Sequence, residues 1–538
     1  IQILKHHGTY QQDNRDLRAE RRRAGLDKAW SMMVRTKTPG GFMTAGQYLL
    51  CDDLAGKYGQ GDLRITSRQG FQFHGVLKGN LRALIHDLMH FQKITTLGAC
   101  GDVVRNVMCA PVSDIDPRFA GVEADLQRLA AEVSTHFLPK TSSYFDLWLD
   151  DEKVSVDADG NVHWKQKPSR EAKQEPIYGK QYLPRKFKIG IATDFDNSID
   201  VYTQDVGIIA VTEGGKLRGF EILAGGGLGH AHSKEDTYAR LGSHLTFVAL
   251  DEVVPVVEAI VKVQRDFGNR EQRHQARLKY TIDRMGLEAF RAKVQEYHGK
   301  PLPEPSGTTP TQQPDYLGWH DQKDGLRYVG LWVENGRVKD FEGGHRFRSG
   351  LRKVVEQFRP TARLTPHHNI ILAGIKPADE AAVRAILVEH GIPTHEGVSP
   401  LRRREMACPA LPLCGLALAE AERALPAILE GVEKAGCSQD DVSIRMTGCP
   451  NSCARPETAE IGIIGRGPNK YHVYVGGDRL GARMNAKVLE DVTAELLPER
   501  LASMLTWWRA ERAGGESFGD WSHRVGTEAI AARIANGA

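Results

Sequence analysis

The sequence predicts an α+β fold made of two pseudo-symmetric halves, in which mixed sheets and helices surround a common site. Superposing Arg64-Ile-Thr66 on Arg363-Leu-Thr365 aligns Phe71 with Ile370 and matches the flanking helices, at an offset of 299 residues. A period this long is not that of a solenoid, so it indicates two related halves. Residues 299–318, between the copies, contain five prolines among polar residues and are predicted to be a linker.

Each half is predicted to contain the same order of elements. In the first half, hydrophobic periodicity predicts strands at 32–35, 63–66 and 70–76, and helices at 45–57 and 80–90. In the second half it predicts strands at 327–333, 362–365 and 368–373, and helices at 349–357 and 377–390, with Asn335-Gly336 as a hairpin-type turn.

Glycine-rich turns follow strand-like sequence in both halves. These turns are Ala224-Gly-Gly-Gly-Leu-Gly229 and Val475-Gly-Gly-Asp-Arg-Leu-Gly481. Such turns let backbone come close to a ligand, or are simply turns. The first lacks the G-x-G-x-x-G pattern that opens a helix in a dinucleotide fold, so a nicotinamide site is not expected.

Three further segments lie outside the repeated elements. Residues 1–30 carry many charges of both signs. This composition favours a solvated helix, or an arm lying over another domain, and makes a docking site for an acidic protein the less favoured interpretation. Helices are predicted at 253–267 and 270–285, before the linker. A last amphipathic helix is predicted at 498–512, where Trp507-Trp508 is expected to pack in the core.

Composition excludes several classes of function. The 538 residues are 41% hydrophobic, enough for two to four domains, and no apolar run is long enough to cross a bilayer. The formal net charge of +3 is too small to imply a nucleic acid or membrane partner. The cysteines do not form a disulfide framework, which predicts a cytoplasmic or similarly reducing compartment. Four of them are expected to be ordinary buried thiols: Cys51, Cys100, Cys109 and Cys437.

The other four cysteines form two pairs in turns rich in proline and glycine. The pairs stand in Cys408-Pro-Ala-Leu-Pro-Leu-Cys414 and Thr447-Gly-Cys449-Pro-Asn-Ser-Cys453. Such turns hold thiolates together and direct backbone N–H groups at sulfur, as an iron-sulfur cluster requires. Structural zinc is the alternative, but its paired cysteines are usually two to four residues apart, so the wider first spacing favours a cluster.

Cationic side chains elsewhere could bind and protonate a small oxyanion. The candidates are Arg68, Arg105, Lys186 and Lys188. Lys186 and Lys188 alternate around Phe187, so on a strand both point to one face. An isolated Lys-x-Lys is usually a solvated strand face, and only the neighbouring cysteine motif favours a functional role.

Cys-x5-Cys followed by Thr-Gly-Cys-Pro-Asn-x-Cys resembles the cluster signature of the sirohaem sulfite and nitrite reductases, and the similarity continues through Phe518-Gly-Asp-Trp521. The resemblance implies that Cys408, Cys414, Cys449 and Cys453 bind a 4Fe-4S cluster, with Cys453 also ligating the sirohaem iron. It implies that Arg68, Lys186 and Lys188 bind and protonate sulfite. It also implies that Arg105 and Asn106 contact the sirohaem.

The resemblance also divides the chain into domains. They are an N-terminal arm (1–30), a first ferredoxin-like half-domain repeat (31–135), a first sirohaem and 4Fe-4S-type domain without the cluster (136–298), the linker (299–318), a second ferredoxin-like repeat (319–396) and a second sirohaem and 4Fe-4S domain with the cluster cysteines (397–538). One departure stands out. Where flavoprotein-coupled relatives have a second substrate arginine in Thr-Arg-Ala-Tyr, this chain has Ser142, for which Lys140 or a charge from elsewhere in the chain would have to compensate.

The predicted function is the six-electron reduction of sulfite to sulfide, with electrons from an external ferredoxin or flavoprotein. The first alternative is a nitrite reductase on the same scaffold, in which the lysine pair resembles Lys-x-Asn, so Lys188 favours sulfite. The second is a non-catalytic iron-sulfur or zinc protein, against which the four cations argue. His74 and the pair His367-His368 are expected to be packed rather than ligating, with His367 the counterpart of Arg68 in the duplication.

Overall fold

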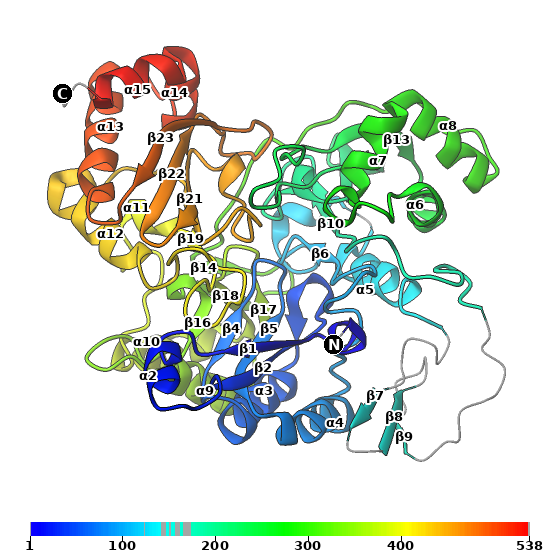
Figure 1. The fold of residues 1–538 in the computed structure, drawn as a ribbon, viewed down its shortest axis with the longest axis horizontal. Coiled ribbons are helices and arrows are strands. Elements are labelled where there is room, and N and C mark those ends of the chain that lie inside the picture. Colours follow the sequence, from blue (N-terminus) through cyan, green and yellow to red (C-terminus); the bar gives the residue numbers. More distant parts are fainter. Residues whose placement is uncertain are drawn as a thin grey trace.

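The computed structural model describes residues 2–122, 124–140, 147–149, 152–156, 162–164 and 174–535. Figure 1 shows three lobes: a lower one built from both ferredoxin-like segments, an upper one around β10 and an upper one around β19–β23. Among the helices of the described ranges, none is both long and apolar enough to cross a membrane. All eight cysteines are free thiols, and Cys51, Cys100, Cys109 and Cys437 are buried as expected.

The lower lobe contains two equivalent antiparallel sheets that exchange a strand. The first has the order β1 (Thr9–Asp13), β2 (Trp30–Arg35), β5 (Phe71–Val76), β4 (Leu63–Ile65) and β16 (Arg337–Val338). The second has the order β14 (Gly318–Asp321), β15 (Arg327–Leu331), β18 (Ile370–Ile375), β17 (Thr361–Leu364) and β3 (Phe42–Met43). Each sheet therefore takes its last strand from the other half of the chain, and the two share one hydrophobic core.

The two upper lobes contain mixed sheets of identical topology. One has the order β13 (Ser243–Val248), β12 (Lys216–Ala224), β11 (Val206–Glu213), β10 (Ile189–Thr193) and β6 (Met108–Cys109). The other has the order β23 (Ala486–Val492), β22 (Lys470–Val475), β21 (Ile461–Gly467), β20 (Ile444–Thr447) and β19 (Met406–Ala407). In both, the three strands nearest the centre are parallel and the outer two antiparallel. The predicted duplication is confirmed.

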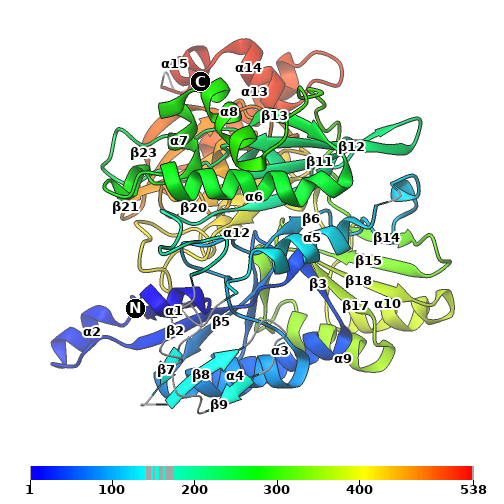
Figure 2. The same ribbon diagram turned by 90° about the vertical axis from the view of Figure 1, so that its right-hand side faces the viewer.

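Helices cover the outer faces of these sheets. Figure 2 shows the long α6 crossing in front of the sheet that contains β11 and β12. The helices are α1 (Gln2–His6), α2 (Arg18–Arg23), α3 (Ala45–Tyr58), α4 (Leu81–Gln92), α5 (Leu126–His136), α6 (Leu250–Phe267), α7 (Leu278–Met285), α8 (Leu287–His298), α9 (Phe347–Phe358), α10 (Glu380–Glu389), α11 (Pro400–Arg403), α12 (Leu425–Val432), α13 (Leu497–Glu511), α14 (Phe518–Val525) and α15 (Thr527–Ala535). A small sheet contains β7 (Leu147–Leu149), β8 (Glu152–Val156) and β9 (Val162–Trp164).

The local sequence explains the element ends that matter most. Thr44 caps α3 in a capping box with Gln47, which satisfies two N–H groups that the first turn leaves free. All five residues of β10 are buried, as in a central parallel strand covered on both faces. Trp507 and Trp508 are buried in the core below α13, as predicted.

Two sequence predictions of local structure were wrong. Asn335-Gly336 is not a hairpin turn: it belongs to a short 3-10 turn, Glu334–Gly336, after which β16 crosses into the other half's sheet. The helix predicted at 270–285 forms only as α7, because the residues before Leu278 make a short 3-10 turn and loop.

The repeated arginines explain why the two halves are interlocked. Arg64 donates to the carbonyl of Ala407 in β19, at 2.7 Å, while its counterpart Arg363 donates to the carbonyl of Pro111, just after β6, at 3.1 Å. Each ferredoxin-like sheet therefore binds the central edge of the upper lobe that belongs to the opposite half. The turn that follows β4 is thereby held at the junction of all three lobes.

Candidate cofactor and substrate site

The cluster cysteines lie in two loops at the central end of β19 and β20. Cys408 follows β19 directly, and Cys449 and Cys453 follow β20. The backbone N–H of Gly448 donates to Cys408 Sγ at 3.4 Å, and the Asn451 side-chain amide donates to Cys449 Sγ at 3.4 Å. These donors stabilise sulfur that carries negative charge, as cluster ligands do.

The four thiols are close enough to interact electrostatically. Burial, followed by the charge of Cys453, raises the pKa of Cys408, of Cys414 and of Cys449, the last to about 11. Within the described residues no three His, Cys, Asp or Glu side chains are grouped as the ligands of one metal ion. A four-iron cluster has a different requirement, because each of its four cysteines binds a separate iron.

Lys186 and Lys188 lie on an extended segment that continues β10. The N–H of Phe187 donates to the carbonyl of Val103 at 3.1 Å, and the N–H of Arg105 donates to the carbonyl of Phe187 at 2.8 Å. Phe187 is buried in the core. The side chains of the two flanking lysines therefore lie on the opposite face of the segment.

That face is crowded with positive charge. Burial and the neighbouring Arg277, Arg185 and Arg105 lower the pKa of Lys186 to about 7. Burial together with Arg68 and Lys186 holds the pKa of Lys188 well below its usual value. Lys186 and Lys188 nevertheless keep part of their surface accessible, as side chains that line a hollow do.

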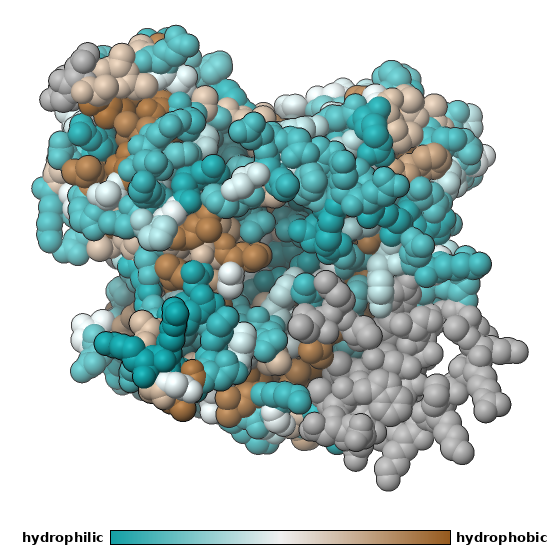
Figure 3. Space-filling view, in the orientation of Figure 1, coloured by the Kyte–Doolittle hydropathy of each residue, from teal (hydrophilic) through white to brown (hydrophobic). Residues whose placement is uncertain are grey.

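Figure 3 shows such a hollow, at the place where Figure 1 has β6 and β10. The carboxylate that faces these cations is already engaged. Asp205 is fully buried, forms an ion pair with Arg277 at 2.8 Å and accepts from the N–H of Lys188 at 2.9 Å. The site therefore has surplus positive charge, which fits a ligand with several negative charges.

Arg68 is held rigidly in the turn between β4 and β5. Its guanidinium donates to the carbonyl of Asn106 at 2.9 Å and also binds the side-chain oxygen of Gln204. Burial, followed by Arg105, lowers the pKa of Arg68 to about 9. The side chain is thus fixed and remains charged at neutral pH.

The side chain of Asn106 holds the backbone of the Arg68 turn in place. Its side-chain amide donates to the carbonyls of Thr38, at 2.7 Å, and Arg68, at 2.9 Å, whereas its Oδ1 is buried without a partner. Arg105 donates through Nε to the carbonyl of Gly101 at 2.9 Å and lies beside Tyr10 and Cys100, which raise its pKa against the effect of burial.

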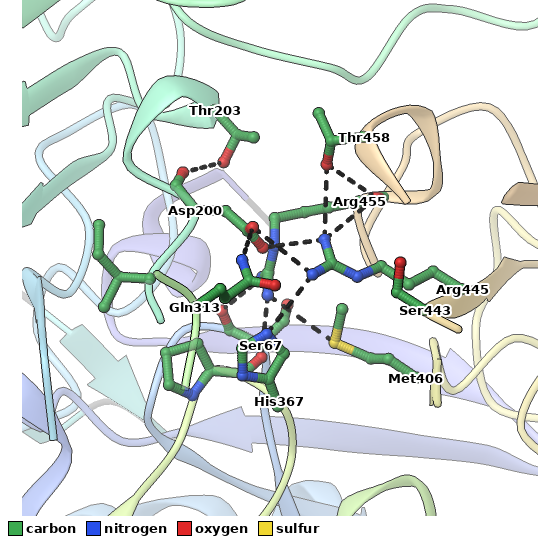
Figure 4. A network of polar contacts seen from close by, with 12 residues as sticks. Ser67, Asp200, Thr203, Gln313, His367, Met406, Ser443, Arg445, Arg455 and Thr458 are labelled. Atoms are coloured by element: carbon green, nitrogen blue, oxygen red, sulfur yellow. Dashed lines mark hydrogen bonds and ion pairs between the residues drawn. The ribbon is translucent and has the colours of Figure 1, made fainter. Parts of the chain in front are cut away.

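A polar network joins the Arg68 turn to the cluster loop (Figure 4). Ser67 Oγ donates to the carbonyl of Cys453 at 2.8 Å, and Arg455 donates to the carbonyl of Ser67 at 3.1 Å. Arg455 also forms an ion pair with Asp200, which binds Arg445 at 2.9 Å and accepts from Gln313 at 2.6 Å. Asp200, Gln313, Arg445 and Arg455 are buried, so the centre of the network is shielded from solvent, and the network includes residues of both halves and of the linker.

The glycine-rich turns approach protein backbone. A Cβ at Gly229 would stand 2.6 Å from the carbonyl oxygen of Asn451, inside the cluster loop, and one at Gly477 would stand 2.2 Å from that of Ala459. The N–H of His230 donates to the carbonyl of Pro450 at 2.9 Å. The turn after β12 therefore packs directly on the cluster loop, where a side chain would not fit.

Sequence reasoning missed six charged residues of this site: Asp200, Asp205, Arg277, Lys279, Arg445 and Arg455. Lys279 donates to the carbonyls of Gly227 and Gly229 at 2.9 and 3.1 Å, and burial followed by Arg277 lowers its pKa to about 7. The alternation in Arg277-Leu-Lys279 was the available signal, because it repeats the pattern around Phe187.

The predicted histidines are packed. His74 is buried beside Gln12 and Gln72, and His367 lies 3.5 Å from an Arg445 nitrogen. His367 occupies the turn equivalent to that of Arg68: Gln69 and His368 both have positive φ (53° and 68°), and both turns close through the preceding threonine. Ser142 lies outside the described residues. The ammonium of Lys140 donates to the carbonyl of Thr135 at 3.1 Å.

Two family models match four segments of the chain. Residues 100–302 and 401–536 match the nitrite and sulphite reductase 4Fe-4S domain, and residues 28–90 and 320–390 match the nitrite/sulfite reductase ferredoxin-like half domain.

Relatives that align over nearly the whole chain belong to the same family. The sulfite reductase [NADPH] hemoprotein beta-component of Staphylococcus saprophyticus is 42% identical over 97% of this chain and 90% of its own length. That of Methylobacterium sp. (strain 4-46) is 42% identical over 100% of this chain and 86% of its own length. The structure of Mycobacterium tuberculosis NirA shares the fold, with a TM-score of 0.77 and 23% identity over 98% of this chain and 90% of that one. The chain belongs to the nitrite and sulfite reductase family.

Proposed function

We propose that this chain is the haemoprotein of a sulfite reductase. In this proposal it binds a 4Fe-4S cluster and sirohaem and reduces sulfite to sulfide with six electrons supplied by a separate flavoprotein or ferredoxin. The observation that carries the proposal is the surplus of positive charge around the partly buried Lys186 and Lys188, beside a turn that Ser67 and Arg455 join to the cluster loop.

The residues present fit both groups. Cys408, Cys414, Cys449 and Cys453 provide four interacting thiols with N–H donors directed at sulfur. Sirohaem carries several carboxylates, and the surplus cations on the face of Lys186 and Lys188 would neutralise them together with the substrate. When bound, the two groups supply the single-electron transfers that side chains cannot perform.

The side chains divide the remaining work by their charge. Arg68, with a pKa of about 9, stays charged at neutral pH and is suited to hold an oxyanion. Lys186, with a pKa of about 7, can release and recover a proton near neutral pH. Sulfite reduction consumes six protons with six electrons and releases three oxygens as water, so proton donors beside the substrate are required. A bound anion would raise both pKa values.

Sulfite is favoured over nitrite for two reasons. Lys188 stands where the corresponding nitrite reductase pattern has Asn, and an additional ammonium favours the dianion over the monoanion. The relatives at 42% identity are also named as sulfite reductases. The free thiols and the cluster cysteines further suggest that the enzyme works in a reducing compartment such as the cytoplasm.

The test has two parts. The purified chain, produced in a host that makes sirohaem, should show haem and cluster absorption in the visible region. With reduced methyl viologen as the only donor it should release sulfide from sulfite with a higher kcat/KM than ammonia from nitrite. A colourless, zinc-containing protein would refute the cofactor assignment, and a preference for nitrite would refute the substrate.

A further inference from the structure

The loop between the first two cluster cysteines and the residues just beyond it form an apolar patch on the surface. Leu416, two residues after Cys414, is 68% exposed, and Leu411 and Leu413 are partly exposed. Cys408 and Cys449 are buried, Cys414 is partly exposed and Cys453 is exposed. Since Cys453 is the expected ligand of the sirohaem, Cys414 marks the side of the cluster that reaches solvent away from the sirohaem, and the exposed Leu416 lies beside it.

The N-terminal arm is bound to this same loop. The N–H of Arg15 donates to the carbonyl of Pro412 at 3.2 Å, and its guanidinium donates to the carbonyls of Ala417 and Cys414 at 2.6 and 3.3 Å. Asp16 forms an ion pair with Arg423 at 2.6 Å. The arm also provides β1 at the edge of the first sheet, so its position is fixed by the sheet on one side of Arg15 and by the cluster loop at Arg15 itself.

Beyond this contact the arm displays positive charge to solvent. Residues 15–28 contain six Lys or Arg and three Asp or Glu, a net +3 that equals the formal charge of the whole chain. Helix α2 buries none of its residues. Arg22 and Arg23 are exposed, and neither has an ion-pair partner within the described part of the chain.

Apolar side chains are interspersed with these cations. Leu17, Leu26 and Trp30 are exposed around α2. Figure 3 shows brown atoms where Figure 1 has the yellow cluster loop, beside the strongly hydrophilic side chains of α2. An apolar centre with a charged rim is the composition of a surface for a transient partner, and the sign of the rim selects an acidic one.

The number of electrons transferred at a time indicates which class of protein the partner belongs to. The relatives named above are described as NADPH enzymes, and NADPH transfers two electrons as hydride, whereas an iron-sulfur cluster accepts one at a time. A flavin performs this conversion. The glycine-rich turn after β12 lacks the dinucleotide fingerprint, and the proposed function takes its electrons from a separate protein, so we assign the flavin to that partner.

We propose that the arm–loop face, defined as Leu17, Arg22, Arg23, Leu26 and Leu416, binds the acidic flavin domain of a separate reductase. This inference rests on the proposed function and adds the place where electrons enter. Each encounter oxidises the reduced flavin by one electron and reduces the cluster by one electron, with no bond formed in this chain. Six encounters serve one sulfite, and hydride from NADPH restores the flavin.

The test uses the complete holoenzyme and three electron donors: reduced flavodoxin as the acidic flavin protein, reduced plant-type ferredoxin, and reduced methyl viologen. The variant is Arg22→Glu with Arg23→Glu, which changes no buried residue. The matched control is Lys216→Glu with Lys376→Glu, which reverses two exposed charges at β12 and before α10, far from α2 in Figure 2.

With flavodoxin, the arm variant is expected to lose about tenfold in kcat/KM, mainly through KM, and the wild-type rate should fall with added salt. The viologen rate and the control variant should be unchanged. Equal flavodoxin kinetics in arm and control variants would overturn the face. A wild type that accepts electrons from ferredoxin but not from flavodoxin would overturn the choice of a flavin partner. Absence of viologen-driven sulfide production would instead refute the proposed function.

Discussion

Asp200 holds two buried arginines, and its substitution tests whether the network in Figure 4 supports the site. Asp200 is fully buried, while Arg445 and Arg455 are 3% and 7% exposed. Asp200→Asn keeps the volume but leaves two guanidinium groups without their counter-charge. Breaking a buried pair in this way costs about 3–5 kcal/mol, because the remaining charge stays desolvated. We expect destabilisation of this size.

The assay is thermal and urea unfolding of holoenzyme, beside a matched exposed pair. Glu213→Gln removes the partner of Arg218, and both side chains are more than half exposed, so a loss below about 1 kcal/mol is expected. Because Arg455 also binds the carbonyl of Ser67, the Asp200 variant should in addition raise the KM for sulfite. Melting temperatures and KM values that match those of the Glu213 variant would refute the reasoning.

The pH dependence has a definite sign. Burial opposes ionisation of Asp200, but Arg445 and Arg455 outweigh it and hold the pKa of this carboxyl below its usual range. Its contribution is therefore present above the unfolded-state pKa of about 3.9 and is lost as the pH falls through the folded-state value. The difference between wild type and Asp200→Asn should stay constant from pH 5 to pH 8.

Three further predictions concern single residues. Lys188→Asn should raise the ratio of nitrite to sulfite turnover, with sulfite kcat/KM falling about tenfold, or about 1.4 kcal/mol; unchanged values for both substrates would make this lysine a bystander. Cys453→Ser should abolish magnetic coupling between haem and cluster in Mössbauer spectra, and retained coupling would exclude it as the bridge. Glu405 is buried with both carboxylate oxygens unpartnered, and burial raises its pKa to about 8. The wild type should therefore lose stability relative to Glu405→Gln as the pH rises from 5 to 8, which the difference between their melting temperatures measures. A difference that does not change with pH would contradict the burial argument.

Much of the fold could be predicted because the duplication repeats local patterns. Arg64 and Arg363 do occupy equivalent strands, β4 and β17, and the flanking helices correspond. The strand exchange could not be predicted, since β3 and β16 have two residues each and no periodicity can show in so short a segment. The same limit explains the wrong hairpin at Asn335, whose turn type fits a hairpin but whose next strand pairs with the opposite half.

The candidate site divides in the same way. The cysteine motif and the Lys186–Lys188 alternation are local, and the structure places both where the lobes meet. Asp200 and Asp205 gave no signal, because their partners Arg455 and Arg277 are 255 and 72 residues away in the sequence. Only folding brings these charges together, because a single acidic residue in the sequence does not indicate a partner so far away along the chain.

The pair Asp200 and Arg455 shows how a duplicated scaffold became an asymmetric site. Each residue precedes the 3-10 turn after the equivalent strand, Val201–Thr203 after β10 and Pro456–Thr458 after β20. Both adopt the left-handed conformation, with φ of 51° and 56°, which is uncommon for residues other than glycine and so indicates a retained backbone.

Asp200 and Arg455 occupy equivalent positions of the two halves and contact each other, and two equal charges there would repel. Opposite charges instead attract, and they make the two equivalent positions chemically different. The half with aspartate carries the lysines, and the half with arginine carries the cluster cysteines. The ion pair thus fixes the half that contains Lys186 and Lys188 against the half that contains the cluster cysteines, so that the two lysines and the cluster loop meet at a single junction.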